Sequence, residues 1–222
     1  MVFGFNRDNV LALLGSTNTL IPQGLLEFFD IIIMSLAIAY IFEGFLRARA
    51  PAPSTPYDPL TAYKKSWFAR FRVDTKSYLI SLYAIAPAVI LHELSHKFVA
   101  LVLGSAATFY ASYGGLALGV LLRLLGSHLI FFVPGFVAHA SGIVAWKGAL
   151  IAFAGPFANL VLWGVSWYLL RNRKRFQFTS RSITILEIAK KINLFLFFFN
   201  MIPLPPFDGG YVMSNLFRMF VG

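Results

Sequence analysis

The stretch that decides the fold reads YLISLYAIAPAVILHELSHKFVALVL and covers residues 78–103. It is long and apolar enough to cross a bilayer as one helix. Within it, His92 and His96 stand four residues apart, so both imidazoles lie on one face of a helix. Two histidines at this spacing can bind one metal ion, and Glu93 can then reach a metal-bound water. The stretch therefore predicts a membrane helix that carries a hydrolytic metal site.

The membrane setting makes an ordinary role for this cluster costly. An ionisable residue at the centre of a membrane helix costs about 2.5 to 3.5 kcal/mol on insertion scales. Glu93, flanked by two histidines, therefore needs a compensating partner, and a metal ion supplies one. The alternative is a polar cluster at a helix end that pairs with Lys97.

The composition is that of an integral membrane protein. The 222 residues are 58% hydrophobic and 13% charged, and the mean hydropathy is +0.72. We therefore expect an all-α polytopic membrane protein, multi-pass and located in the cell membrane. Its four expected transmembrane helices are Leu25–Leu46, Ser77–Leu103, Lys147–Leu170 and Ile183–Met201. Because the chain has no cysteine, a metal site has to be built from histidine and carboxylate.

The net charge of +10 does not indicate nucleic-acid binding, because the basic residues concentrate between apolar segments. Those between Arg47 and Lys76 are mixed with aromatic residues, which is typical of a segment facing anionic headgroups. We expect an amphipathic helix from Leu60 to Phe71 in this segment. We divide the chain into an N-terminal region, 1–76, with the first span and this basic linker, and a membrane core, 77–222.

The segment from Gly104 to Trp146 is apolar but interrupted by many glycines. We expect a membrane-associated β-hairpin or re-entrant region here, packed over the metal helix, because irregular backbone at this depth must be buried in protein or line a cavity. A strand around Thr108–Tyr113 would offer an edge to which an unwound substrate could pair. The competing interpretation is an additional span at Leu124–Trp146.

A catalytic zinc needs a third protein ligand. After Glu93 the only acidic residues are Glu187 and Asp208. Glu187 stands four residues before Lys191, a spacing typical of an ion pair on a helix surface. Asp208 lies beyond three prolines that break the fourth span, on a turn at its end, and is the best candidate.

Two further motifs accompany the metal helix. They are Ala154-Gly155-Pro156-Phe157-Ala158-Asn159 and Asn200-Met201-Ile202-Pro203, the latter followed by Phe207-Asp208-Gly209. With His-Glu-x-x-His before them, the chain resembles the site-2 protease family of intramembrane metalloproteases. Phe207 replaces the usual leucine, and the link between residues 171 and 182 is too short for the PDZ domain that many relatives insert.

The resemblance implies one zinc ion bound by His92, His96 and Asp208, with Glu93 as the general base. The expected activity is a zinc-dependent endopeptidase that cleaves transmembrane segments of other membrane proteins within the lipid bilayer. Asn200 and Asn159 are expected to position substrate, although Asn200 could instead cap the broken helix. Oligomeric state and substrate identity are not indicated.

Two other functions fit parts of the sequence. One is a non-catalytic membrane scaffold or chaperone with a structural metal site, although such a site is normally closed by four protein ligands. The other is a zinc protease whose third ligand is glutamate.

The orientation in the membrane also has two interpretations. The positive-inside rule places the basic loops in the cytoplasm, which would put the metal site toward the outside. The family resemblance instead implies a metal site near the cytoplasmic face.

Overall fold

The computed structural model describes residues 5–13, 22–48, 72–127, 133–140 and 142–221. Its helices are α1 (Arg7–Leu13), α2 (Gln23–Ala48), α4 (Thr75–Ala84), α5 (Ala86–Val102), α6 (Tyr113–Leu124), α7 (Ala145–Arg171), α8 (Arg173–Phe176), α9 (Ser180–Asn200) and α10 (Asp208–Val221). The strands are β1 (Ala107–Ala111) and β2 (Gly135–His139). The expected amphipathic helix at Leu60–Phe71 falls outside the described residues.

Three helical segments are long and apolar enough to cross a membrane: Gln23–Leu46, Thr75–Val102 and Ala145–Arg171. They confirm the first three expected spans and, with the small hairpin, the all-α polytopic fold class. The fourth expected span corresponds to α9, which is not among the described segments apolar enough to cross a membrane, because charged residues in the first half of the expected span lower its hydropathy. These residues are Glu187, Lys190 and Lys191.

The second span is divided into α4 and α5. Asp74 caps the start of α4 by accepting a hydrogen bond from the Ser77 N–H, and Ile85 joins the two helices. Pro87 stands in the first turn of α5, where its missing N–H leaves no helical bond unmade. The division therefore costs little, and it lets α5 present its histidines toward α7.

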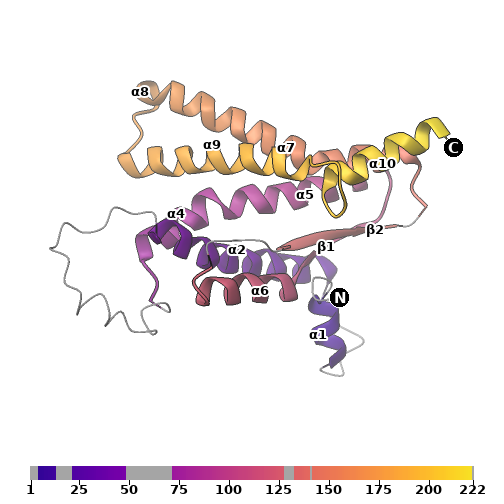
Figure 1. Cartoon of the computed structure of the whole chain (residues 1–222), viewed down its shortest axis with the longest axis horizontal. Helices are drawn as coiled ribbons and strands as arrows, with labels where there is room; N and C mark the ends of the chain where they lie inside the picture. Colours follow the sequence, from indigo (N-terminus) through magenta and orange to yellow (C-terminus); the bar gives the residue numbers. More distant parts are fainter. Residues whose placement is uncertain (1–4, 14–21, 49–71, 128–132, 141, 222) are drawn as a thin grey trace.

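The last two helices follow one another along the same partner. Both α9 and α10 pack against α7, and the short 201–207 connection carries Pro203, Pro205 and Pro206. In Figure 1 the first part of the long α7 lies beside α10, and the rest of α7 lies beside α9. Proline cannot continue a helix, so the chain breaks at the level of the middle of α7 and restarts at Asp208.

The two strands form the expected hairpin. They pair antiparallel, with Phe109 opposite Val137 and Ala111 opposite Gly135. The short helix α6 lies between them in the chain, as expected for a mixed strand and re-entrant segment. The alternative of an additional span at 124–146 is wrong for the described part of this segment, because residues 135–139 are a strand and α7 begins only at Ala145.

The elements form layers, with α7 and α9 above α5 and with the hairpin, α2 and α6 below it (Figure 1). The main hydrophobic core lies between α2, the α4–α5 pair, β1 and α6. Its buried side chains are Met34, Ile38, Ala84, Ile85, Ala86, Phe109, Ala111 and Leu116. This core holds the hairpin directly beneath the metal helix.

Acidic side chains on α2 anchor three other parts of the fold. Glu27 pairs with Lys97 on α5, Asp30 with Arg7 on α1, and Glu43 with Arg123 on α6. All three carboxylates are buried. Burial is tolerated only because each charge is paired, so α2 connects α1, α5 and α6 through its acidic residues. Lys97 is thereby engaged by Glu27 rather than by the histidine cluster, which removes the alternative explanation of that cluster.

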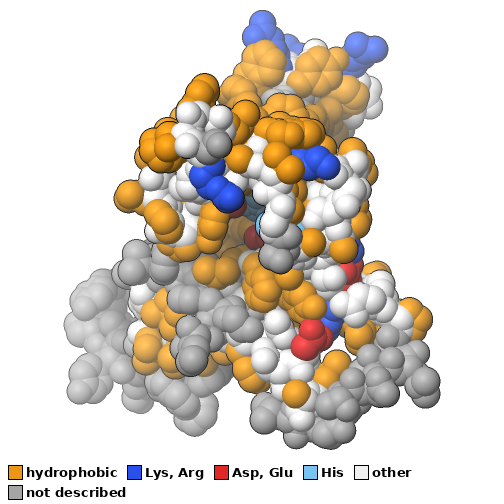
Figure 2. Space-filling model, turned by 90° about the vertical axis from the view of Figure 1, so that its right-hand side faces the viewer, with side chains coloured by type: hydrophobic (Ala, Val, Ile, Leu, Met, Phe, Trp, Pro, Cys, Tyr) orange, Lys and Arg blue, Asp and Glu red, His pale blue; other side chains and the backbone are white. Residues whose placement is uncertain are grey.

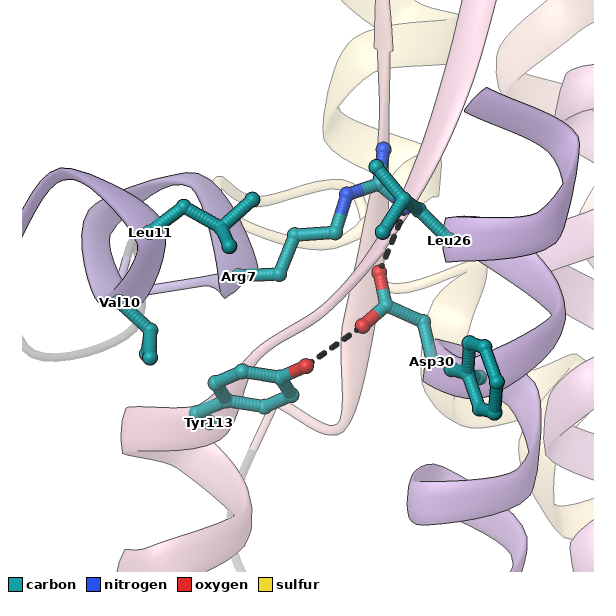
Figure 3. Close-up of a pocket in the computed structure, with 7 residues that line it drawn as sticks. Arg7, Val10, Leu11, Leu26, Asp30 and Tyr113 are labelled. Atoms are coloured by element: carbon teal, nitrogen blue, oxygen red, sulfur yellow. Dashed lines mark hydrogen bonds and ion pairs between the residues drawn. The ribbon is translucent and has the colours of Figure 1, made fainter. Parts of the chain in front are cut away.

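The Asp30 pair is part of a small network between α1 and α2. Asp30 accepts hydrogen bonds from Arg7 at 3.1 Å and from the Tyr113 hydroxyl at 2.8 Å (Figure 3). The Arg7 guanidinium also lies over the Tyr110 ring, 4.7 Å from its centroid. A pocket of about 170 Å³ beside this network is lined mainly by apolar side chains of α1 and α2. The network therefore fixes α1 against the strand region.

The surface is strongly hydrophobic. Orange side chains are spread over the whole described part of the face in Figure 2, and Lys and Arg side chains lie at the top, the end where Figure 1 places α8. Exposed apolar residues occur along α2, α5 and α7, for example Phe28, Phe98 and Val165. A bilayer is the solvent in which such a surface is stable.

Candidate metal centre

The two histidines of α5 lie side by side and point their Nε2 atoms to one place. The Nε2 atoms are 3.2 Å apart, and both side chains are buried. Nδ1 of His92 lies 2.6 Å from the Asn159 side-chain oxygen, and Nδ1 of His96 lies 2.6 Å from the Ile151 carbonyl oxygen. Because each Nδ1 faces an acceptor, it carries the proton, and each Nε2 is left with a free lone pair.

Asp208 completes the group from the first residue of α10. Its Oδ2 atom lies 3.0 Å from Nε2 of His92 and 3.4 Å from Nε2 of His96. This buried oxygen has no hydrogen-bond partner among the described residues. A buried, unpartnered carboxylate oxygen is costly, and a cation bound between this oxygen and the two imidazoles would remove that cost.

A zinc ion satisfies these three atoms. Zinc in proteins is tetrahedral with ligand bonds of about 2.0 to 2.2 Å, which places neighbouring ligand atoms about 3.3 to 3.6 Å apart. The three separations found here are 3.0, 3.2 and 3.4 Å. Two imidazole lone pairs and one carboxylate oxygen converge with no donor between them, and this donor set fits a divalent cation.

Gly155 of α7 provides the space beside the histidines. A Cβ atom at this position would lie 2.3 Å from Nε2 of His96 and 2.6 Å from Nε2 of His92. Both distances are too short for any side chain, so only glycine lets α7 approach α5 this closely. Pro156 follows within the helix. The glycine of the Ala-Gly-Pro sequence is therefore explained by its close contact with the two Nε2 atoms.

Asn159 lies behind the His92 ring and is fully buried. Its Oδ1 faces Nδ1 of His92, and its Nδ2 donates to the Ala88 carbonyl oxygen at 3.0 Å and to Oδ1 of Asn193 at 2.9 Å. Every hydrogen-bonding atom of its amide group is engaged inside the protein. The geometry thus places Asn159 behind a histidine, in contrast to the expected contact with substrate.

Glu93 lies close to the group without belonging to it. Its charge interacts with those of His92, His96 and Asp208, and its side chain is partly buried. The described residues offer one group of candidate ligands, and it consists of His92, His96 and Asp208. Glu93 is therefore an acidic residue beside the three candidate ligands and not one of them.

The other two expected residues are placed as follows. Asn200 stands on the last turn of α9, partly buried, and its side chain makes no hydrogen bond to the described residues. The Asn200 amide therefore does not cap the end of α9 through a hydrogen bond to the described residues. Glu187 forms a surface ion pair, as expected, but the partner is Lys190 at 2.8 Å rather than Lys191.

The turn before Asp208 is tightly packed. A Cβ at Gly209 would lie 2.4 Å from the Met201 carbonyl oxygen, and one at Gly210 would lie 2.6 Å from the Leu204 carbonyl carbon. The Phe207 ring packs edge to face on Phe199 of α9, with centroids 4.8 Å apart. The two glycines and this aromatic contact hold the start of α10, and with it Asp208, against the end of α9.

The expected open edge on β1 is wrong, because α2 covers it. Phe109 donates its backbone N–H to Glu27 at 3.2 Å, and Ala111 gives a backbone hydrogen bond to Asp30. The opposite edge belongs to β2. Ala140 donates to the Ala106 carbonyl, so by alternation the N–H groups of Val137 and His139 point away from β1. No described residue accepts a hydrogen bond from either.

Sequence reasoning missed two parts of this arrangement. Asn193 of α9 is buried, accepts from Asn159 and donates to the Ala189 carbonyl oxygen. An asparagine in the middle of an apolar helix was the available signal, because polar groups at membrane depth need partners. The Ile151 carbonyl that holds His96 has no sequence signal, because every residue has a carbonyl group.

The family model described as Peptidase family M50 matches residues 172–222. A protein of Methanocaldococcus jannaschii named "Putative zinc metalloprotease" is 38% identical over 138 residues, which are 62% of this chain and 70% of that protein.

A Bacillus subtilis protein with the same name is 31% identical over 143 residues, and the match covers 57% of this chain and 64% of that protein. No solved structure matches the chain at a significant level. The first relative extends the similarity well beyond the C-terminal segment that the family model matches.

Proposed function

Because the chain belongs to peptidase family M50, the site-2 protease family, we propose that it hydrolyses peptide bonds within or next to transmembrane segments of other membrane proteins. It is a membrane metalloprotease with zinc as its cofactor. The observation that carries this proposal is the convergence of His92, His96 and Asp208 between helices apolar enough to span a bilayer. A site between such helices supports entry of the substrate from the lipid.

We assign His92, His96 and Asp208 as the zinc ligands. When bound, zinc acts as a Lewis acid that lowers the pKa of a coordinated water and polarises the carbonyl group under attack. Asp208 offers an anionic oxygen, and the two histidines offer neutral nitrogens. Three protein ligands leave a fourth position for water, as in catalytic rather than structural zinc sites.

Glu93 is the proposed general base. Its carboxylate takes one proton from the attacking water, and the water oxygen forms the new bond to the carbonyl carbon. When the C–N bond breaks, Glu93 gives that proton to the leaving nitrogen. The products are a carboxylic acid and an amine, which become a carboxylate and an ammonium group once the remaining proton passes from the acid to the amine, and Glu93 is again ionised. Its position beside the ligands, without belonging to them, supports this role.

Asn159 and Asn193 are proposed to position a ligand and not substrate. The Asn159 carbonyl oxygen accepts from Nδ1 of His92, and this bond keeps the Nε2 lone pair directed at the metal position. Asn193 in turn holds the Asn159 amide. We retain Asn200 as the candidate substrate contact, because its amide is not engaged by the described residues.

A helical substrate hides its carbonyl groups in its own hydrogen bonds, so the scissile region must first unwind. Addition of the unwound segment to an open strand edge would restore the lost backbone bonds. We propose the outer edge of β2, at Val137 and His139, as that edge, since the outer edge of β1 is occupied by α2.

The proposal is tested with the purified full chain in detergent, loaded with zinc, and a panel of transmembrane segments from unrelated membrane proteins. Cleavage inside or at the border of an apolar segment, and its loss on zinc removal, are the expected results. Cleavage of soluble peptides alone would contradict the intramembrane part, and no cleavage of any segment by zinc-loaded protein would favour the scaffold alternative.

A further inference from the structure

The turn from α7 to α9 carries a dense group of basic side chains. They are Arg171, Arg173, Lys174, Arg175 and Arg181, which we call the basic turn. All five are exposed, and no described acidic residue forms an ion pair with any of them. The sequence between Ala145 and Leu186 contains no acidic residue. The nearest one after the turn, Glu187, is already paired with Lys190.

The position of this turn relative to a bilayer follows from α7. Trp146 and Trp167 are both exposed, and each is approached by a cation, Lys147 at 5.6 Å and Arg171 at 5.4 Å from the ring centroid. At about 1.5 Å per residue they stand about 32 Å apart along the helix. The hydrocarbon core of a bilayer is about 30 Å thick, and tryptophan concentrates at its two borders.

The basic turn therefore begins where the hydrocarbon ends. Trp167 marks the border, Arg171 lies one turn of helix beyond it, and the other four cations follow within the next ten residues. Phe176 and Phe178 stack on each other at 5.5 Å within the turn, and Phe176 is exposed. Cations mixed with aromatic rings at this depth are suited to phosphate headgroups.

We propose that the basic turn is a binding surface for the headgroups of anionic phospholipids. Five unneutralised positive charges at headgroup level attract lipids with net negative charge, and zwitterionic lipids much less. Arginine adds geometry to this attraction, because its guanidinium forms paired hydrogen bonds with phosphate oxygens. This inference does not depend on the proteolytic function, since it concerns the end of α7 away from Gly155.

The test measures lipid retention by the delipidated full chain in a neutral detergent, using native mass spectrometry with phosphatidylglycerol or phosphatidylcholine of identical acyl chains. We expect retention of phosphatidylglycerol in preference to phosphatidylcholine, weakened by added salt because screening reduces exposed charge interactions. Equal retention of the two lipids by the unaltered protein would overturn the proposal without any variant.

A triple variant, R173Q/K174Q/R175Q, should bind phosphatidylglycerol about tenfold less tightly or worse, given the contribution of each basic residue near an anionic surface. The matched control, K76Q/K191Q/R218Q, removes three cations elsewhere, leaves the Glu187–Lys190 pair intact and should retain the lipid. The variant R173K/R175K keeps the charge and should retain most of the binding. Equal losses in the two glutamine variants would show attraction to net charge only and would contradict a site at this turn.

Discussion

Nδ2 of Asn159 donates a hydrogen bond of 2.9 Å to Oδ1 of Asn193, and through it α9 is connected to the metal centre. The chain of contacts continues from Asn159 to Nδ1 of His92. Neither asparagine touches the metal position. Partners of metal ligands nevertheless influence affinity, because they fix the tautomer and the ring orientation.

Asn193→Ala should therefore lower zinc affinity by roughly 10- to 100-fold, as loss of such outer partners typically does. Chelator competition on the purified protein measures this directly, without reference to activity. Asn172→Ala is the matched control, because Asn172 also donates to a backbone carbonyl of its own helix but lies at the far end of α7. Unchanged zinc affinity in Asn193→Ala would remove Asn193 from the site.

Glu93→Gln should separate catalysis from metal binding. The amide has nearly the shape of the carboxylate but cannot accept the proton, so the cleavage rate should fall by about 2 orders of magnitude or more. Zinc per protein should stay close to one, because Glu93 lies outside the ligand group. The measurement pairs metal analysis with cleavage of one model transmembrane substrate. Loss of zinc in this variant would mean that Glu93 is a ligand.

Asp208→Asn tests the third ligand. A neutral amide is a much poorer ligand for a dication than a carboxylate. Loss of a residue that only holds a ligand in place typically lowers zinc affinity by roughly 10- to 100-fold, and Asp208→Asn should lower it by at least as much. Glu187→Gln is the control and should leave zinc binding unchanged, because Glu187 only pairs with Lys190. The reverse result, with zinc lost from Glu187→Gln alone, would overturn the assignment.

Gly155→Ala should abolish zinc retention, because the new methyl group would occupy the space in front of both Nε2 atoms. Gly164→Ala is a control on the same helix, where a Cβ meets nothing within 4 Å. That control should keep zinc and stabilise the protein by about 0.5 to 1 kcal/mol, since glycine is unfavourable inside a helix. Metal analysis and thermal unfolding distinguish the two, and full zinc occupancy in Gly155→Ala would contradict the close approach of α7 to the histidines.

Val137→Pro tests substrate addition to β2. Proline removes the outward N–H of this residue without touching a ligand. Loss of one such hydrogen bond should reduce cleavage by up to about tenfold, with zinc content unchanged. His139→Pro should behave in the same way, because its N–H points to the same edge. Full activity in both variants would exclude this edge of β2.

The sequence allowed much of the site to be predicted. The histidine spacing predicts two candidate ligands on one helix face, the scarcity of acidic residues leaves few choices for the third, and in the structure the three candidate ligand atoms lie together. Apolar runs likewise locate spans, since the bilayer sets their length. These features are local or compositional, so they can be recognised without knowing how the helices pack.

What could not be predicted depends on packing between distant segments. Asn159 was expected at the substrate, yet Asn193 and Ala88 hold it against His92. The open edge was expected on β1, yet the α2 carboxylates cover it. In both cases a polar group had several possible partners, and only the tertiary arrangement decides which one it takes.

The acidic residues of α2 also bear on how the protein enters the membrane. Glu27, Asp30 and Glu43 lie along one apolar helix, and an unpaired charge costs about 2.5 to 3.5 kcal/mol at the centre of a span and less toward its ends. Two of their partners, Lys97 and Arg123, are synthesised only after α2. The ion pairs of Glu27 and Glu43 can therefore form only once α5 and α6 have been synthesised, whereas Asp30 can pair with Arg7 as soon as α2 is complete.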